Sequence, residues 1–153
     1  GSFRLGHGVS LGYYAQEHEG IRDGESVLAH VRAESFDASD QDLRRLLGMF
    51  GLIGPVAFQD AGTLSGGEKT KLALAQLVAG RRNLVLLDEP TNNLDPPSRT
   101  AVAEALAGWS GSMVLVSHDV EFVRALSPHK VLMMPDGELA FWDDELLGLV
   151  ALA

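Results

Sequence analysis

The chain has 153 residues, of which 46% are hydrophobic and 22% are charged, and these proportions are typical of one folded domain rather than of a disordered tail. Its 12 Lys and Arg against 21 Asp and Glu give a formal net charge of −9, so any contact with nucleic-acid phosphates must be local. The sequence has no cysteine, which excludes a disulfide framework and a cysteine nucleophile and favours the cytoplasm. No apolar stretch approaches the roughly 20 residues that cross a bilayer.

The first 80 residues predict one strand followed by a group of helices. An apolar and aromatic run predicts the strand, which ends at a polar group that contains Gln16. Helical spacing of apolar residues predicts the helices, the last of which begins at Ser65 and ends at Gly80. The expected elements are a strand at residues 9–14 and helices at residues 25–34, 39–50 and 65–79. The helices form an expected insert over residues 20–80. This insert separates the two parts of a sheet core, residues 1–19 and residues 81–153.

Two apolar strands follow the insert. Residues 83–87 are an uninterrupted run rich in Val and Leu, typical of a strand buried on both faces of a parallel sheet, and residues 113–116 repeat the pattern. Between them Asp95 predicts a helix cap and Pro96 the first helical position. Further expected elements are helices at residues 96–109 and 120–126 and a closing hairpin of residues 130–134 and 138–142. The alternation of strands and helices predicts an α/β fold with a parallel sheet.

Polar side chains follow three of the predicted strands. Gln16 follows the first, Asp88 and Glu89 follow the second, and His118 follows the third. In open α/β sheets, ligands bind beyond the carboxyl ends of the strands. An Asp-Glu pair there suits phosphoryl chemistry, because one carboxylate helps to hold Mg²⁺ and the next positions an attacking water. The alternative interpretation is an exposed acidic loop.

The sequence Ser65-Gly66-Gly67-Glu68 begins the last helix of the insert. A Ser cap with bare glycine amides at a helix N-terminus favours binding of a phosphate. The alternative is a capping box between Ser65 and Glu68, which needs no ligand. That alternative leaves the two glycines unexplained.

Together these motifs resemble those of the ATP-binding cassette family. LSGGE at residues 64–68 is similar to the signature of that family, LVLLDEP at 84–90 to its Walker B strand, SHD at 117–119 to its switch histidine, and YAQ at 14–16 to its Q-loop. The sequence LDEPTNNLD at 87–95 is similar to the F subfamily in particular. That subfamily usually has TNHLD, so Asn93 is a departure from its pattern.

The resemblance implies a role for each residue at the strand ends, with ATP and Mg²⁺ as the cofactors. Gln16 would reach the Mg²⁺ and the attacking water, and Asp88 would belong to the Mg²⁺ shell. Glu89 would act as the general base on the water, and His118 would contact the γ-phosphate.

The resemblance also implies that the signature acts on a different nucleotide. Cassettes of this family sandwich ATP in pairs, so Ser65 and Gly67, with their neighbours Gly66 and Glu68, would contact the γ-phosphate of a nucleotide held mainly by a second cassette. Asp95 would lie on the loop that crosses the interface. The second cassette is therefore an expected partner, in the same polypeptide for the F subfamily.

A complete cassette also has a phosphate loop with a Gly-Lys pair before the Q-loop. The three lysines of this sequence, Lys69, Lys71 and Lys130, each follow a residue other than Gly. We therefore expect this chain to be the C-terminal portion of a cassette, inactive by itself. The absence of a basic helix after the closing hairpin favours the second cassette of such a protein.

The resemblance implies a soluble ATPase that acts on the ribosome, in translation or antibiotic resistance. The net charge argues weakly against ribosome binding, although Lys69, Lys71, Arg81 and Arg82 predict one locally basic helix. One alternative is the motor subunit of a membrane transporter for drug export. Another is a non-catalytic module that serves as a dimer surface.

Overall fold

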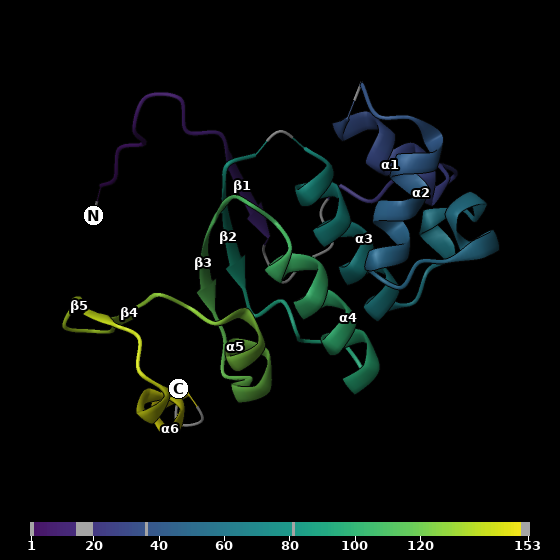
Figure 1. Ribbon diagram of the computed structural model, residues 1–153. Coiled ribbons are helices and arrows are strands. Elements are labelled where there is room, and N and C mark those ends of the chain that lie inside the picture. Colours follow the sequence, from purple (N-terminus) through teal and green to yellow (C-terminus); the bar gives the residue numbers. More distant parts are fainter. Residues whose placement is uncertain (1, 15–19, 36, 81, 151–153) are drawn as a thin grey trace.

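A parallel sheet has the order of strands and helices that the sequence predicts. The computed structural model describes residues 2–14, 20–35, 37–80 and 82–150 (Figure 1). Strands β1 (Leu11–Tyr14), β2 (Leu84–Asp88) and β3 (Ser112–Val116) form a three-stranded parallel sheet in that order. In its register Tyr14 pairs with Leu87, and Asp88 pairs with Val116. The carboxyl ends of the three strands therefore meet at one edge, which confirms the predicted α/β class.

Helices cover one face of this sheet. Helices α4 (Pro96–Ala107) and α5 (Val120–Leu126) lie beside it in Figure 1. Val85 and Leu87 of β2 share one buried cluster with Val102 of α4 and Phe122 of α5. Removing such side chains from water stabilises a fold by about 1.5 to 3 kcal/mol each. This buried face fixes the sheet beneath the loops that leave its carboxyl edge.

The opposite face of the sheet is largely open. Tyr13 of β1 is 58% exposed and Val114 of β3 is 52% exposed. Along β2 the residues alternate between fully and partly buried. The prediction that residues 83–87 and 113–116 are buried on both faces is therefore wrong for this structure, because no described element covers the second face.

The helical insert packs around its own core. It contains α1 (Val27–Glu34), α2 (Asp40–Met49) and α3 (Gly66–Ala79), and the short 3₁₀ turns η1 (Gly54–Phe58) and η2 (Ala61–Thr63). Ser26, Ser39 and Ser65 cap the three helices by accepting a backbone N–H. The largest fully buried side chains of the insert are those of Phe50, Leu43, Leu47, Leu52, Leu72 and Leu74.

A hairpin follows the sheet region but does not extend the sheet. Strands β4 (Lys130–Met133) and β5 (Glu138–Phe141) pair with each other in an antiparallel sheet of two strands that projects from the α/β unit (Figure 1). Phe141 is 81% exposed, and the Lys130 ammonium lies 5.7 Å from the centre of its ring. The short elements η3 (Asp144–Leu146) and α6 (Leu147–Val150) follow. Among the described helices, none combines the length and the apolar character needed to cross a bilayer.

Candidate functional site

The glutamate after β2 and the histidine after β3 meet at the carboxyl edge of the sheet. His118 Nδ1 lies 2.9 Å from Glu89 Oε2. The approach lacks the alignment of a hydrogen bond, and buried Oε2 has no hydrogen-bond partner among the described residues. The His118 side chain is 58% exposed, so solvent reaches the pair at the histidine. A carboxylate oxygen that lacks a hydrogen bond within the described residues can accept a proton from a water or a ligand.

The loop that carries Glu89 has an unusual backbone. Glu89 has φ of +48° and Asn93 has φ of +68°. Asn tolerates this left-handed region, whereas for Glu it costs about 1 to 3 kcal/mol. Two hydrogen bonds hold the strained residue: its N–H donates to the Val116 carbonyl at 2.9 Å, and its own carbonyl accepts from Asn92 N–H at 3.2 Å. The left-handed residue lies directly after the end of β2.

Asp88 is the last residue of β2 and lies one position before Glu89. Among the described residues, no three His, Asp or Glu side chains converge into a metal site of their own. Mg²⁺ is commonly held by one or two carboxylates, with water and substrate phosphates as its other ligands. The donors at this edge therefore fit a magnesium ion that arrives with a nucleotide. Gln16, the other predicted ligand, lies outside the described residues.

The predicted capping box is present at the start of α3. Ser65 Oγ accepts from the Glu68 N–H at 3.3 Å, and Glu68 Oε2 accepts from the Ser65 N–H at 2.9 Å and from its hydroxyl at 2.8 Å. These bonds from Ser65 lower the pKa of Glu68 below its ordinary value. The Ser65 hydroxyl is thus already engaged within the chain, so contact with a phosphate requires it to turn away from Glu68.

The two glycines of this motif have different surroundings. A β-carbon at Gly67 would lie 2.7 Å from the Asn93 carbonyl oxygen, closer than real contacts allow. A β-carbon at Gly66 would meet no atom within 4 Å. Packing within the chain therefore explains Gly67 but not Gly66. The open space beside Gly66 is consistent with close approach of a ligand to the backbone.

Asp95 caps α4, as the sequence predicts. Its carboxylate accepts from the Ser98 N–H at 3.1 Å, and hydrogen bonds from Ser98 lower the pKa of Asp95. Nearby, the Arg99 guanidinium donates to the Leu94 carbonyl at 3.0 Å and pairs with Asp119 at 3.0 Å. Arg99 thus joins the loop after β2 to the loop after β3.

The structure therefore brings most of the predicted site residues into two groups. Glu89 and His118 meet at the sheet edge beside Asp88, and Ser65 to Glu68 lie at the start of α3. Asn93 connects the groups, because its carbonyl contacts Gly67. Sequence reasoning missed this role of Asn93 and that of Arg99. Asn in a turn was a signal for the left-handed backbone, but nothing in the sequence indicated the partner of Asn93.

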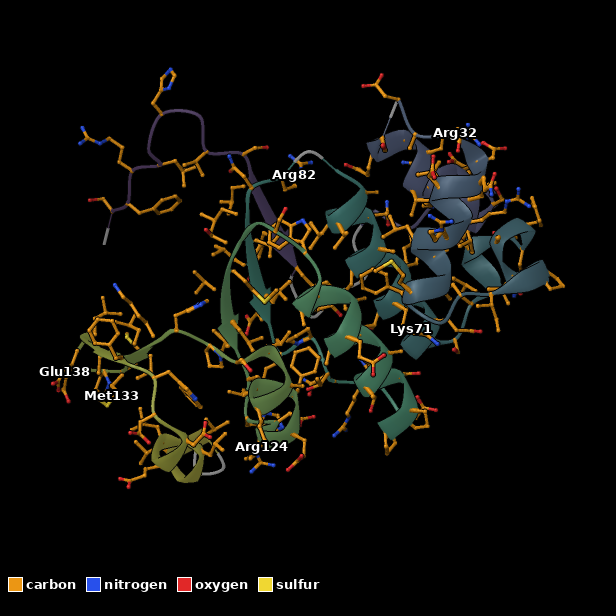
Figure 2. The ribbon with its side chains drawn as sticks, viewed as in Figure 1. Arg32, Lys71, Arg82, Arg124, Met133 and Glu138 are labelled. Atoms are coloured by element: carbon orange, nitrogen blue, oxygen red, sulfur yellow. The ribbon has the colours of Figure 1, made fainter. Side chains whose placement is uncertain are left out.

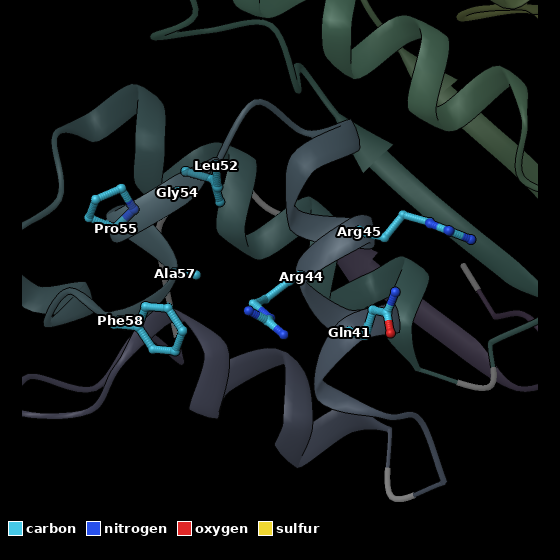
Figure 3. A pocket seen from close by; sticks show the side chains of 8 residues that line it. All are labelled: Gln41, Arg44, Arg45, Leu52, Gly54, Pro55, Ala57 and Phe58. Atoms are coloured by element: carbon cyan, nitrogen blue, oxygen red, sulfur yellow. The ribbon is translucent and has the colours of Figure 1, made fainter.

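A hollow on the described surface lies away from both groups. It has a volume of about 750 Å³ and lies between α2 and η1 (Figure 3). The Arg44 side chain points toward Ala57 and Phe58 across it, whereas Arg45 points away. Its lining residues are Gln41, Arg44, Arg45, Leu52, Gly54, Pro55, Ala57 and Phe58. None of them belongs to the groups at the sheet edge or the start of α3.

The chain is similar in sequence to a known family and to individual proteins. The family described as ABC transporter matches residues 7–92. The chain is 44% identical over 125 residues to "Probable ATP-binding protein YheS" of Haemophilus influenzae, which covers 81% of this chain and 20% of that protein. It is 35% identical over 117 residues to "ATP-binding cassette sub-family F member 3" of Mus musculus, 76% of this chain and 16% of that protein. The chain thus spans about a fifth of the length of these relatives.

Solved structures agree on the fold. The dimeric structure of a bacterial ABC transporter cassette superposes with a TM-score of 0.72 at 20% identity, over 87% of this chain and 63% of that one. At this identity the likeness shows the fold alone, the α/β core of an ATP-binding cassette with its helical insert. The match of the family model over residues 7–92 shows that the chain belongs to the ATP-binding cassette family.

Proposed function

We propose that this chain forms part of an ATPase that binds ATP between two cassettes and hydrolyses it with Glu89 as the general base. The observation that carries the proposal is the buried Glu89 oxygen, which has no hydrogen-bond partner among the described residues and lies 2.9 Å from His118. A general base must reach the proton that it accepts, and a carboxylate oxygen that lacks a hydrogen bond at the carboxyl edge of the sheet meets that requirement. The strained backbone at Glu89 is also typical of functional sites.

The roles of the other residues at this edge follow from their chemistry. Asp88, together with Gln16, would hold Mg²⁺, which when bound neutralises developing charge on the phosphates. His118 is close enough to orient the Glu89 carboxylate and exposed enough to donate to a phosphate oxygen. Glu89 would then take one proton from the attacking water while the water oxygen bonds to the γ-phosphorus and the bond to the leaving ADP oxygen breaks.

The start of α3 would bind the phosphate of a nucleotide that the second cassette holds. The positive end of the helix dipole favours an anion there, and the absence of a side chain at Gly66 leaves room for it. Ser65 would donate to the phosphate after its hydroxyl leaves Glu68, and Gly67 would keep the turn close to Asn93. Glu68 stabilises the first turn of α3 through the capping box. Asp95 caps α4 and so orders the end of the loop that follows β2. The second cassette is thus a partner in this proposal.

We further propose that the partner of the closed protein is the ribosome, with a role in translation or antibiotic resistance in the cytoplasm. The similarity of residues 87–95 to the F subfamily, and that of the chain to a relative named as a sub-family F member, support this assignment. Surface charge gives it little support, since Lys71 lies within α3 whereas Arg82 follows the C-terminal end of that helix, at a distance from Lys71 (Figure 2). Arg82 pairs with Glu34 at 3.4 Å, and Lys71 contacts Ser98 at 3.4 Å.

The substitution Glu89→Gln tests mechanism and partner together, in a protein that contains this chain with a complete pair of cassettes. Glutamine keeps the shape of the side chain but cannot accept the proton, so hydrolysis should slow by roughly 10²- to 10⁴-fold while ATP binding remains. The measurements are single-turnover hydrolysis and sedimentation with purified ribosomes in ATP. We expect the ATP-trapped variant to sediment with ribosomes. An unchanged rate would remove Glu89 from the catalytic role, and co-purification with a membrane protein instead would favour a transporter motor.

A further inference from the structure

The turn that leads to Ser65 is joined to the segment that leads into α1. The Val27 N–H donates to the Gln59 carbonyl at 3.0 Å, and the Ala61 N–H donates to the Glu25 carbonyl at 2.9 Å. These bonds form an isolated antiparallel bridge between residues more than 30 positions apart. The two segments therefore meet backbone to backbone, although no strand is formed.

Asp60 adds a side-chain link at the same place. One oxygen, Oδ1, accepts from the Gly24 N–H at 2.9 Å and from the Gly62 N–H at 2.8 Å. The Gly62 bond is a local cap of η2, which many turns have. A local cap has no need of the Gly24 bond, which reaches across 36 positions of sequence. Bonds from backbone amides to an ionised carboxylate are also stronger than neutral ones.

Close packing reinforces the link. A β-carbon at Gly62 would lie 3.2 Å from the Asp23 α-carbon and would overlap the Asp23 carboxylate. On the other side, the segment is fixed to α1 by fully buried His30. Its Nε2 accepts from the Arg22 N–H at 2.9 Å, and its Nδ1 lies 2.8 Å from the Ser26 carbonyl, which it can reach only as a donor. The segment is therefore held to α1 on one side and to Asp60 on the other.

We infer that Asp60 is a positioning residue for the phosphate-binding end of α3. It ties the turn three residues before Ser65 to the start of α1, so that Ser65 and Gly66 are presented in one fixed orientation. The inference rests on the proposed function, since it assumes that this helix end contacts a phosphate held by the second cassette. Asp60 itself touches no reacting atom and acts through Gly62.

The test compares three variants in the two-cassette protein. Asp60→Ala removes both amide bonds. Asp60→Asn keeps an oxygen that can accept them. Asp42→Ala is the matched control, because Asp42 also is a carboxylate at a helix start, paired with Ser39 at 2.6 Å, but it joins no distant segment. The measurements are kcat and KM for ATP, with a thermal unfolding curve for each variant.

We expect Asp60→Ala to lower kcat by about tenfold or more, since small displacements of positioning groups have effects of this size. KM for ATP should change little, because the second cassette holds most of the nucleotide. Asp60→Asn should recover most of the lost kcat. Asp42→Ala should have the kcat of the unsubstituted protein, although its Tm falls by a similar amount to that of Asp60→Ala. Equal kcat in the two alanine variants, or no recovery with Asn, would overturn the inference.

Hydrogen exchange in the present chain tests the link without any activity. Asp60→Ala should accelerate exchange of the Gly24 and Gly62 amides together, and leave the amide of Asp42 unchanged. Acceleration at Gly62 alone would reduce Asp60 to a local cap and overturn the inference. Failure of the proposed function has a different signature: the unsubstituted two-cassette protein would show no hydrolysis that depends on Glu89, whatever the exchange result.

Discussion

The backbone carbonyl of Asn93 lies directly against Gly67, 2.7 Å from the position where a β-carbon would stand. This contact joins the loop that follows β2 to the first turn of α3. The group around Glu89 and the group around Ser65 are therefore connected through this one backbone contact. A displacement of the loop after β2 would therefore also displace the first turn of α3, because the backbone of Asn93 cannot move aside as a flexible side chain would.

This contact predicts opposite effects for two adjacent glycines. Gly67→Ala should destabilise the chain by about 1 to 3 kcal/mol, the usual cost of overpacking against a rigid neighbour. Gly66→Ala should be neutral or stabilising by up to about 1 kcal/mol, because Ala favours a helix and its β-carbon meets open space. Urea unfolding of the two variants measures the difference. Equal stabilities would show that the Asn93 contact is not a constraint.

Much of the fold could be predicted because local signals agree with it. Serine caps mark the starts of α2 and α3, and Asp95 with Pro96 marks that of α4, each where the structure begins the helix. The approach of Glu89 to His118 also followed from the sequence, since parallel strands end at one edge of a sheet. These predictions depend on neighbouring residues or on strand direction alone.

Other features depend on contacts that no local pattern encodes. The turns η1 and η2 are too short for a periodic pattern, so residues 51–63 predicted no structure. Burial of both faces of β2 could not be judged from its apolar run, because that depends on what covers the sheet. The strained backbone of Glu89 and the link from Asp60 to Gly24 likewise arise from tertiary hydrogen bonds.

The capping box predicts a specific dependence of stability on pH. Bonds from Ser65 lower the pKa of Glu68 in the folded chain, whereas the unfolded chain has the ordinary value of about 4.3. A lowered folded pKa contributes stability that is present above the unfolded pKa and is lost as pH falls through the folded one. Glu68→Gln can keep the capping geometry without that titration. The difference in Tm between the native chain and this variant should be largest at pH 7 and shrink below about pH 4.

Thermal unfolding from pH 7 to pH 3 measures this difference. Glu104→Gln serves as the control, because it also removes one negative charge, and no side-chain hydrogen bond or ion pair of Glu104 is found among the described residues. The Tm of Glu104→Gln should stay closer to that of the native chain from pH 7 to pH 3. A Glu68→Gln profile parallel to the native one at every pH would contradict the assigned role of the carboxylate.

The last prediction separates the signature serine from an ordinary helix cap. In the two-cassette protein, Ser65→Arg should block ATP-dependent closure of the cassettes, because a large side chain fills the space beside Gly66, and leave ATP binding at the phosphate loops intact. Ser39→Arg is the matched control, since Ser39 caps α2 with the same type of bond, at 3.2 Å from the Asp42 N–H. Both variants lose a cap worth about 1 kcal/mol, so their unfolding curves should shift alike. Closure is measured as the distance between labels on the two cassettes. It should fail in Ser65→Arg and occur normally in Ser39→Arg. Normal closure in a folded Ser65→Arg protein would show that Ser65 is a structural cap and that the phosphate is bound elsewhere.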